Sequence, residues 1–577
     1  MTEAIEAIKQ KRQEWEEKVL KPALHRFNLT ESPTEFYTPA DIEDFDFLTR
    51  VGFPGQYPFT AATYPTSPYI PAPRRGLPSA SGLVRAATYS GYGTAEDTRN
   101  YYKEMQKRGQ RRGPNLAFDL PTQCGYDSDN PLVRGEVGKT GVAVDTLRDF
   151  EMIYEPFQGD LELDKIASNF TINAPCNIII SMFFALAEKR GVPLSKLRAT
   201  PQNDILKEFI ARGTYIFPPR PSMRMFRDSL VFFTRYCPNV NITSIGGYHI
   251  RGAGATREQD LAYSMAILIA YLQEGVNAGL DVDSFAPRFT VNAFGGSMDF
   301  FKEIAFQRAA RRMWAKILKE KFGARNERSM LLRQPAGAHM GYENCTVQRP
   351  LNNLTRSVVG AIASALSGGP PIPMPPYDEP LGLGWSLEAS QLAEDAFKIL
   401  YYEAKLTRVL DPLAGSYYVE HLTDEIEEAA WKELGKIESM GGIVAAIESG
   451  YVQREIAKSA YERQRRIENG EELIVGVNCF VGEHELEVQI TRLVPHPYDP
   501  DKRERAEERQ IQNLAEVKHN RDNHAATQLL RELKEKAKKE DENLIPHLIE
   551  CAKAYVTEQE MCDTLREVFG EYEPTTV

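Results

Sequence analysis

The sequence contains little that would indicate disulfide bonds, a membrane segment or a secretory route. Its seven cysteines are scattered over 577 residues without a CxxC pair, so we expect neither a zinc site nor a disulfide framework. No apolar run approaches the roughly 20 residues that span a bilayer. Residues 1–20 predict a charged amphipathic helix, not a signal peptide. These absences favour the reducing cytosol, and we expect a cytoplasmic protein without membrane contact.

The chain also lacks an excess of positive charge. The formal net charge is −12 and the isoelectric point is about 5.5, which argues against general nucleic-acid binding. The apolar share of 42% and the charged share of 26% are typical of a globular protein. A chain of this length can bury a large core and form two or more structural units.

Strand and helix patterns alternate through the middle of the chain. We expect strands near residues 115–120, 169–174, 197–200, 242–246, 287–292 and 329–333, and two less regular ones near 369–374 and 408–411. Helices are expected between most of them, including 176–190, 256–278 and 297–322. Repeated βα units predict a parallel sheet. About eight such units favour an α/β fold of the (β/α)₈ TIM-barrel type over a doubly wound sheet, and no GxGxxG follows a strand.

The pattern divides the chain into three parts. Residues 1–90 form an N-terminal arm and a long loop, residues 91–420 form the barrel, and residues 421–577 form a helical C-terminal region. The loop is rich in Gly, Pro, Tyr and Ser, and long ordered loops of this kind are usually functional. Further along, Thr94 and Asp97 predict a capping box at the start of a helix.

The segment 198–224 combines a strand end, a polar loop and a short helix. We expect the helix to begin at Asn203 or Asp204 and to end at Arg212, because Gly213 follows. This arrangement can hold an anionic acyl group next to a fixed arginine. The alternative is an ordinary βα loop with a solvated arginine.

The same segment resembles the substrate-binding segment of the methylmalonyl-CoA mutase family. These adenosylcobalamin-dependent enzymes rearrange the carbon skeletons of acyl-CoA esters. In that family a threonine and a glutamine contact the substrate and an arginine holds its free carboxylate, and Thr200, Gln202 and Arg212 occupy those places. The family threads the pantetheine chain of CoA along the axis of a barrel, which the resemblance implies here as well.

The resemblance extends to further motifs and implies roles for their residues. Tyr89 would act with Arg212 on the carboxylate, and the pair Tyr248–His249 would place a histidine on the thioester carbonyl. The implied substrate-binding residues are Tyr64, Thr66, Arg85, Thr200, Gln202, Arg288, Thr290 and Arg333, with Arg74 and Arg75 as other candidates for the CoA phosphates. The implied cofactor-binding residues are Ala117, Glu379 and His339.

Departures from the family pattern point to the substrate. Tyr89 and Arg212 match the branch that handles a free carboxylate. The isobutyryl-type and hydroxyisobutyryl-type branches carry Phe or Ile at the place of Tyr89 and Gln at the place of Arg212. Ala117 replaces the aspartate of the hydroxyacyl branch. The loop after Arg333 and the loop at 368–376 are rich in Gly, Pro and Ala. We therefore expect a substituted malonyl-CoA or succinyl-CoA with a substituent larger than methyl.

A cobalamin domain needs an Asp-x-His-x-x-Gly motif whose histidine ligates cobalt. Asp522 and His524 almost provide it, but Thr527 replaces the glycine and the surroundings predict helix. We expect adenosylcobalamin to be held mainly by a separate small subunit in a heterotetramer. Two alternatives stay open: a non-catalytic acyl-CoA-binding barrel that is a partner or chaperone of a mutase, and an ordinary methylmalonyl-CoA mutase subunit. A cofactor-free lyase is disfavoured, because no metal-ligand cluster or strand-end lysine is present.

Overall fold

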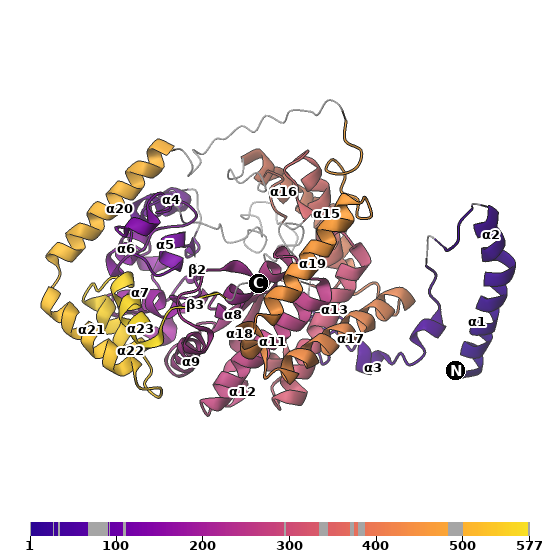
Figure 1. Cartoon of the computed structure of the whole chain (residues 1–577), viewed down its shortest axis with the longest axis horizontal. Helices are drawn as coiled ribbons and strands as arrows, with labels where there is room; N and C mark the ends of the chain where they lie inside the picture. Colours follow the sequence, from indigo (N-terminus) through magenta and orange to yellow (C-terminus); the bar gives the residue numbers. More distant parts are fainter. Residues whose placement is uncertain are drawn as a thin grey trace.

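The computed structural model describes residues 2–26, 28–32, 35–66, 91, 93–107, 111–293, 296–333, 344–369, 374–378, 387–482 and 500–574. Short strands lie at the centre and helices surround them (Figure 1). The N-terminal arm projects from one side, and the last four helices cover the other.

Five short parallel strands form two sheets. The first sheet has the order β1 (Asn115–Ala117), β2 (Ala167–Thr171), β3 (Arg198–Pro201). The second pairs β4 (Thr243–Gly246) with β5 (Phe289–Ala293). Backbone hydrogen bonds join the two, because Asn241 N donates to Ala199 O at 2.9 Å and Ser244 N donates to Gln202 O at 2.8 Å. The strands thus lie side by side in chain order, as repeated βα units predict, but those described do not close into a barrel.

Two of the expected strands are wrong. Residues 327–330 form a short helix, α14 (Glu327–Met330), because the Asn326 side chain caps it by accepting from Arg328 N at 3.0 Å. The chain nevertheless runs beside β5, since Val291 N donates to Arg333 O at 2.8 Å. Residues 408–411 follow a 3₁₀ turn and are not extended in a sheet. Residues 370–373 lie outside the described residues.

The helices between the strands agree with the sequence pattern. Thr94 N donates to Asp97 Oδ2 at 2.9 Å and Asp97 N donates to Thr94 Oγ1 at 3.2 Å, which confirms the predicted capping box. The helices of this part are α4 (Ala95–Lys107), α5 (Leu120–Gln123), α6 (Leu147–Ile153), α7 (Cys176–Lys189), α8 (Ile205–Lys207), α9 (Pro219–Tyr236), α10 (Gly247–Gly252), α11 (Arg257–Asn277), α12 (Val282–Phe285), α13 (Phe300–Lys316) and α15 (Asn352–Leu366).

The first sheet has one apolar face and one polar face. Leu116 and Phe170 are buried in the main core, against the helices. On the other face, Asn115, Asn169 and Thr200 are register partners across the three strands. These three side chains keep intermediate exposure although they lie in strands at the centre of the molecule. Solvent therefore reaches the polar face, which is compatible with the CoA route that the family resemblance implies.

The C-terminal region is helical, as expected. Its helices are α17 (Tyr417–Ser439), α18 (Ile443–Glu448), α19 (Tyr451–Glu468), α20 (Pro500–Asn520), α21 (Asn523–Ala537), α22 (Ile545–Lys553) and α23 (Glu558–Phe569), and α16 (Leu387–Lys398) precedes this region. Helix α17 packs along α13 and α11, and α22 packs along α7. No described helix is long and apolar enough to cross a bilayer.

A buried ionic layer joins α13 to the C-terminal region. The Arg308 guanidinium is fully buried and donates to the carboxylates of Asp411 and Glu420, the latter at 2.5 Å. One turn on, Arg312 donates to Glu427 and to Asp424, the latter at 2.6 Å. Each of these buried charges is paired with an opposite charge, so removing one residue would leave its partner buried without a counter-charge.

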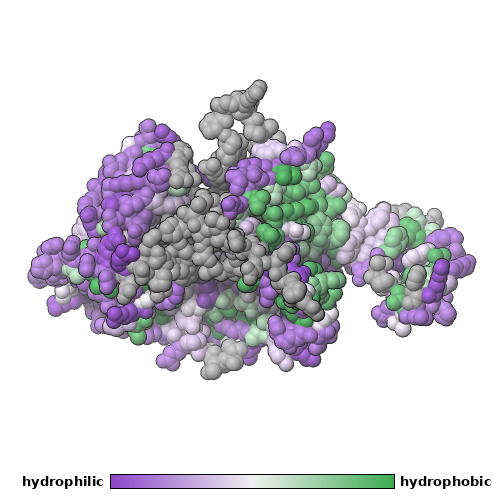
Figure 2. Space-filling model, turned by 90° about the horizontal axis from the view of Figure 1, so that it is seen from above, coloured by the Kyte–Doolittle hydropathy of each residue, from purple (hydrophilic) through white to green (hydrophobic). Residues whose placement is uncertain are grey.

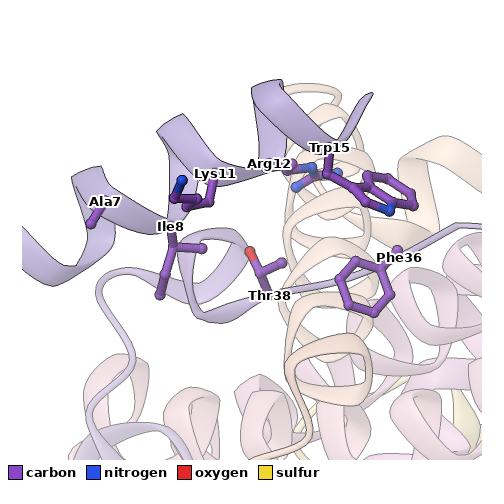
Figure 3. A pocket seen from close by; sticks show the side chains of 7 residues that line it. All are labelled: Ala7, Ile8, Lys11, Arg12, Trp15, Phe36 and Thr38. Carbon is purple, nitrogen blue, oxygen red and sulfur yellow. The ribbon is translucent and has the colours of Figure 1, made fainter. Parts of the chain in front are cut away.

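The described part of the N-terminal arm contains α1 (Thr2–Trp15), α2 (Lys21–Arg26), a stretch without regular structure at residues 35–38, a 3₁₀ turn (Pro39–Ile42) and α3 (Phe47–Arg50). A shallow pocket lies between α1 and residues 35–38 (Figure 3). It is lined by Ala7, Ile8, Lys11, Arg12, Trp15, Phe36 and Thr38. It lies in the arm, away from the central strands (Figure 1). The pocket therefore belongs to the arm and not to the predicted substrate site.

The molecular surface is unevenly polar. Figure 2 shows hydrophilic residues over the side of the C-terminal helices and an apolar area on the opposite half, where α15 and α16 lie. Leu351, Leu392 and Ile399, on or next to these helices, stay exposed by 46% to 50%. Exposed apolar side chains that gather in one area are typical of a protein–protein contact.

Candidate functional site

Side chains from neighbouring strand ends meet around Gln202. Asn173 follows β2, and its amide Nδ2 donates to Gln202 Oε1 at 2.9 Å. Gly246 ends β4, and a Cβ placed on it would lie 3.6 Å from Gln202 Nε2 and 3.4 Å from His249 Nδ1. Gly246 thus lies between Gln202 and His249, and both side chains stand at the carboxyl edge of the sheet.

The predicted Tyr-His pair starts the helix that follows β4. Tyr248 and His249 lie in α10, with ring centroids 4.0 Å apart and ring planes inclined by 38°. The backbone at the start of this helix is fixed, because Gly246 N donates to Asp204 Oδ2 at 2.8 Å. His249 therefore stands at a strand end, as the sequence predicted, where barrel-type α/β enzymes carry their catalytic residues.

Asp204 occupies the predicted N-cap position but does not cap the helix. Its Oδ2 accepts from Gly246 N, and its Oδ1 accepts from Tyr271 OH at 2.8 Å. The carboxyl group is completely buried, and burial raises the pKa of Asp204 to about 6, although Lys207 and the two hydrogen bonds oppose the rise. Asp204 thus positions the start of α10, the helix that carries His249.

Replacing Asp204 by Asn should remove a pH-dependent cost to stability. Below pH 4 both folded and unfolded Asp204 are protonated, and above pH 6 both are ionised. Between these limits the unfolded carboxyl releases its proton first, so the folded state loses stability as pH rises. A rise in the pKa of Asp204 from 3.8 to about 6 corresponds to a loss of about 3 kcal/mol in the free energy of unfolding above pH 6. Urea unfolding should show D204N gaining on the wild type between pH 4 and pH 7.

Asp160→Asn is the matched control, because Asp160 is exposed at the surface. Its free energy of unfolding should follow that of the wild type at every pH. If D204N and the wild type differ by the same amount at pH 4 and pH 7, the burial effect on Asp204 is not present.

A buried ion pair follows Asp204 in the chain. Lys207 and Glu208 are both fully buried and their side chains pair directly. Glu208 Oε1 also accepts from Asn173 Nδ2 at 2.7 Å, and its Oε2 accepts from Thr214 Oγ1 at 2.5 Å. Burial lowers the pKa of Lys207. For Glu208, burial acts to raise the pKa, but Lys207 and Arg212 outweigh it and hold the pKa below its usual value.

Arg212 ends the helix, as expected, but through a π-helical turn, η7 (Glu208–Arg212). The following Gly213 is left-handed, with φ of +85°. Arg212 Nη1 donates to Thr214 Oγ1 at 3.2 Å and to the side-chain oxygen of Gln123. The side chain keeps 27% of its exposure. Single π turns occur frequently at functional sites, and this one leaves the guanidinium anchored on one nitrogen and accessible elsewhere.

A second group of predicted residues lies towards the amino ends of the strands. Asn241 Nδ2 donates to Thr200 Oγ1 at 2.8 Å, and Arg333 Nη1 donates to Asn241 Oδ1 at 3.5 Å and to a backbone carbonyl. Arg288 Nη2 donates to Thr234 Oγ1 at 2.7 Å. Burial lowers the pKa of Arg288 to about 10.

Neither Arg288 nor Arg333 forms an ion pair with another residue that the structure describes. Thr290 contributes to the strand itself, because its Oγ1 donates to Thr243 O at 3.0 Å. The structure thus divides the predicted residues between two ends of one sheet, with Gln202, Tyr248 and His249 at one end and Thr200, Arg288 and Arg333 towards the other.

The remaining predicted residues are less informative. Ala117 ends β1 and is buried, and its carbonyl accepts from Val142 N at 2.9 Å. Tyr64 and Thr66 are exposed where the described part of the N-terminal segment ends. A Cβ on Gly252, at the end of α10, would meet no atom within 4 Å, so the space beside it is open. Four predicted residues lie outside the described residues: Arg85, Tyr89, His339 and Glu379, as do Arg74 and Arg75.

The near-match to a cobalt-binding motif is a helix start. Asp522 is the N-cap of α21, and its Oδ1 accepts from His524 N and Ala525 N, each at 3.0 Å. His524 is exposed. In the part of the chain that the structure describes, no group of His, Cys, Asp and Glu could hold a metal ion. The helical interpretation of this motif is therefore confirmed.

Sequence reasoning missed the polar residues that support these side chains. Gln123, Asn173 and Glu208 are polar residues of types that are common at the surface, and no periodicity distinguishes them from surface residues. Only the folded structure shows that they are buried and hydrogen-bonded to Gln202 or Arg212.

Comparison with known proteins decides the family. The pattern of the family described as methylmalonyl-CoA mutase matches residues 30–571. The chain belongs to this family. It is 39% identical to the 2-hydroxyisobutanoyl-CoA mutase large subunit of Aquincola tertiaricarbonis, over 94% of this chain and 91% of that protein.

Other relatives are longer than this chain. It is 37% identical to the mitochondrial methylmalonyl-CoA mutase of Mus musculus, over 90% of this chain and 66% of the relative. It is 36% identical to the methylmalonyl-CoA mutase large subunit of Streptomyces virginiae, over 93% of this chain and 70% of the relative. The chain thus spans about two thirds of the mitochondrial mutases.

Membership of the methylmalonyl-CoA mutase family establishes an isomerase. The chain is an acyl-CoA mutase catalytic subunit, and its family uses adenosylcobalamin. This result supports the enzyme over the non-catalytic binding or chaperone alternative. The identities to the hydroxyisobutanoyl and methylmalonyl relatives differ by two to three percentage points, too little to choose a substrate.

Proposed function

We propose that this mutase subunit acts on a carboxylated acyl-CoA of the substituted malonyl-CoA or succinyl-CoA type, with a substituent larger than methyl. The observation that carries the proposal is Arg212, which is held at the end of a π-helical turn and remains accessible. A guanidinium binds a carboxylate through two parallel hydrogen bonds. Tyr89 would act with it on the same carboxylate.

The charge around Arg212 supports an anionic ligand. Glu208 is shared between Lys207 and Arg212, and it lies 3.5 Å from Arg212, while Lys207 also faces the buried carboxyl group of Asp204. Gln123 and Thr214, the other partners of Arg212, are neutral. Among the described residues, the carboxylate that reaches Arg212 is therefore one that it shares with Lys207, and the accessible part of the guanidinium can pair with a substrate carboxylate in a partly water-excluded site, where Coulomb attraction is stronger than in bulk water.

His249 would hold the thioester carbonyl, with Tyr248 beside it and Gln202 across Gly246. Thr200, Arg288 and Thr290 would hold the CoA thioester arm, and Arg333 would add positive charge towards the amino ends of the strands. Tyr64, Thr66 and Arg85 would cover the substrate from the N-terminal segment. The half-exposed polar face of β1–β3 supports a route for the CoA arm through a (β/α)₈ barrel, formed by residues 91–420 between the arm of residues 1–90 and the helical region of residues 421–577.

Adenosylcobalamin, when bound, supplies the radical that begins the rearrangement. The open space beside Gly252 fits a large group at the carboxyl edge of the sheet. Ala117, Glu379 and His339 would contact it from this chain. The small subunit that the name of the Aquincola relative implies would hold it on the other side, in a heterotetramer. The exposed apolar area near α15 and α16 supports such a partner (Figure 2).

The sequences of two loops, most of whose residues lie outside the described ones, support a large substituent. The residues after Arg333 read Gln-Pro-Ala-Gly-Ala, and residues 368–376 are rich in Gly and Pro. Glycine and alanine leave volume unfilled, and proline fixes a loop without occupying that volume. An apolar substituent bound there gains roughly 0.8 kcal/mol for each buried CH₂ group.

We expect an aryl- or long-alkyl-substituted malonyl-CoA to exceed methylmalonyl-CoA in kcat/KM by more than about tenfold, because two or more extra CH₂ equivalents are buried. The measurement is a competition assay with both esters present. The enzyme is the full chain reconstituted with a separate cobalamin-binding subunit and adenosylcobalamin.

The same assay tests the alternatives. Equal turnover, or a preference for the methyl ester, would make this an ordinary methylmalonyl-CoA mutase subunit with divergent loops. Preferential turnover of 2-hydroxyisobutanoyl-CoA, a substrate without a free carboxylate, would overturn the assignment of Arg212.

A further inference from the structure

Near the C-terminal end of the described chain, Tyr572 contacts the segment 209–216, which contains Arg212. Tyr572 N donates to Ile216 O at 3.1 Å. The Tyr572 ring lies edge-on to Phe209, with centroids 4.8 Å apart, and edge-on to Tyr215, with centroids 4.7 Å apart. Phe209 and Tyr215 stack on each other at 5.5 Å. Tyr572 therefore closes an aromatic cluster around the turn that ends at Arg212.

Helix α23 supports Arg212 from its other side. Arg566 Nη2 donates to Cys124 O at 2.9 Å, and its Nη1 donates to Gly125 O at 3.2 Å. The preceding residue is Gln123, whose side-chain oxygen accepts from Arg212. Only 10% of the Arg566 side chain is exposed. The helix thus fixes the backbone that presents the neutral partner of Arg212.

The two supports meet at Gly125. This glycine has φ of +69°, and a Cβ placed on it would lie 2.6 Å from Cys562 Sγ and 2.8 Å from Ile216 Cδ1. The turn after α5, helix α23 and the segment 209–216 therefore pack directly against one another, and no room for a side chain remains at Gly125. A displacement of the C-terminal segment would therefore move both Gln123, which accepts from Arg212, and the segment 209–216, which carries Arg212.

We propose that Tyr572 and Arg566 are positioning residues that set the selectivity for a carboxylated acyl group by fixing Arg212. The inference rests on the proposed function, because it assumes that Arg212 binds the carboxylate. Neither side chain touches the substrate. Their effect is to hold the guanidinium where a bidentate pair can form, and a misplacement of about 1 Å is costly in such a pair.

The test measures binding of succinyl-CoA and of butyryl-CoA to the full chain by isothermal titration calorimetry. The two esters have acyl chains of the same carbon number and differ by the terminal carboxylate. For Tyr572→Ala we expect the preference for succinyl-CoA to fall about tenfold while butyryl-CoA binds as in the wild type. Tyr572→Phe keeps the ring and should keep the preference. Arg566→Gln acts on the other anchor and should lower the preference as well.

Tyr555→Ala is the matched control. Tyr555 is also in the C-terminal region, but its hydroxyl donates to Glu151 at 2.9 Å, away from Arg212. It should leave the preference unchanged. If Arg212→Gln leaves the preference intact, the proposed function fails. If Arg212→Gln abolishes it but both Tyr572→Ala and Arg566→Gln retain the wild-type preference, the positioning role is overturned and the proposed function stands.

Discussion

Arg212→Gln is expected to lower kcat/KM for a carboxylated acyl-CoA by about a hundredfold or more. Removing one member of a desolvated guanidinium–carboxylate pair costs roughly 3–5 kcal/mol, because the carboxylate is left without a counter-charge. The introduced glutamine side chain would retain one hydrogen bond and no charge. Steady-state kinetics of the reconstituted enzyme with its best malonyl-type ester measure the loss.

Arg220→Gln is a suitable control for Arg212→Gln. Arg220 lies eight positions further along the chain, keeps 73% of its exposure and pairs with Glu448 at 2.9 Å. An exposed pair of this kind is worth about 1 kcal/mol or less, so kcat/KM should stay near the wild-type value. Wild-type kcat/KM in Arg212→Gln would show that the substrate carboxylate binds elsewhere.

Arg308→Met is expected to give the largest loss of stability. The substitution leaves Asp411 and Glu420 buried without the guanidinium that both contact. Breaking a buried ionic group in this way costs about 3–5 kcal/mol. Urea unfolding should show a lower midpoint with an unchanged slope, because the extent of surface exposed on unfolding is the same.

The contrast is Arg325→Met. Arg325 is 82% exposed and pairs with Asp281 at 3.4 Å, so its removal should change the free energy of unfolding by less than about 1 kcal/mol. Equal midpoints for Arg308→Met and Arg325→Met would mean that the layer between α13 and α17 does not stabilise the fold.

The positions of the strands and long helices could be predicted because each has a strong periodic pattern. Helix α11 was expected at 256–278 and is observed at Arg257–Asn277. The strand expected at 329–333 failed for a local reason: Asn326 begins a helical turn by capping it, and such side-chain capping competes with extended structure. Closure of the barrel stays a prediction.

The candidate site was predicted in part. The location of His249 after β4 and of Arg212 at a helix end followed from strand–helix punctuation and from family motifs. The burial of Lys207 and Glu208 did not, because both residues look like solvated first-turn charges in the sequence. Glu208 also accepts hydrogen bonds from Thr214, further along its own segment, and from Asn173, which comes from another segment. Side-chain networks that join separate segments leave no periodic signal in a single sequence.

The polar face of β1–β3 has a consequence for protein engineering. Leu116 and Phe170 pack into the core, whereas Asn115, Asn169 and Thr200 face away from it on the same strands. Along these strands, one set of alternate positions therefore packs the core, and the other set faces the space that we propose for the CoA arm. A combinatorial library restricted to the three polar positions should yield mostly soluble, folded variants with altered acyl-CoA preference, while a library at the apolar positions of the same strands should yield mostly aggregates.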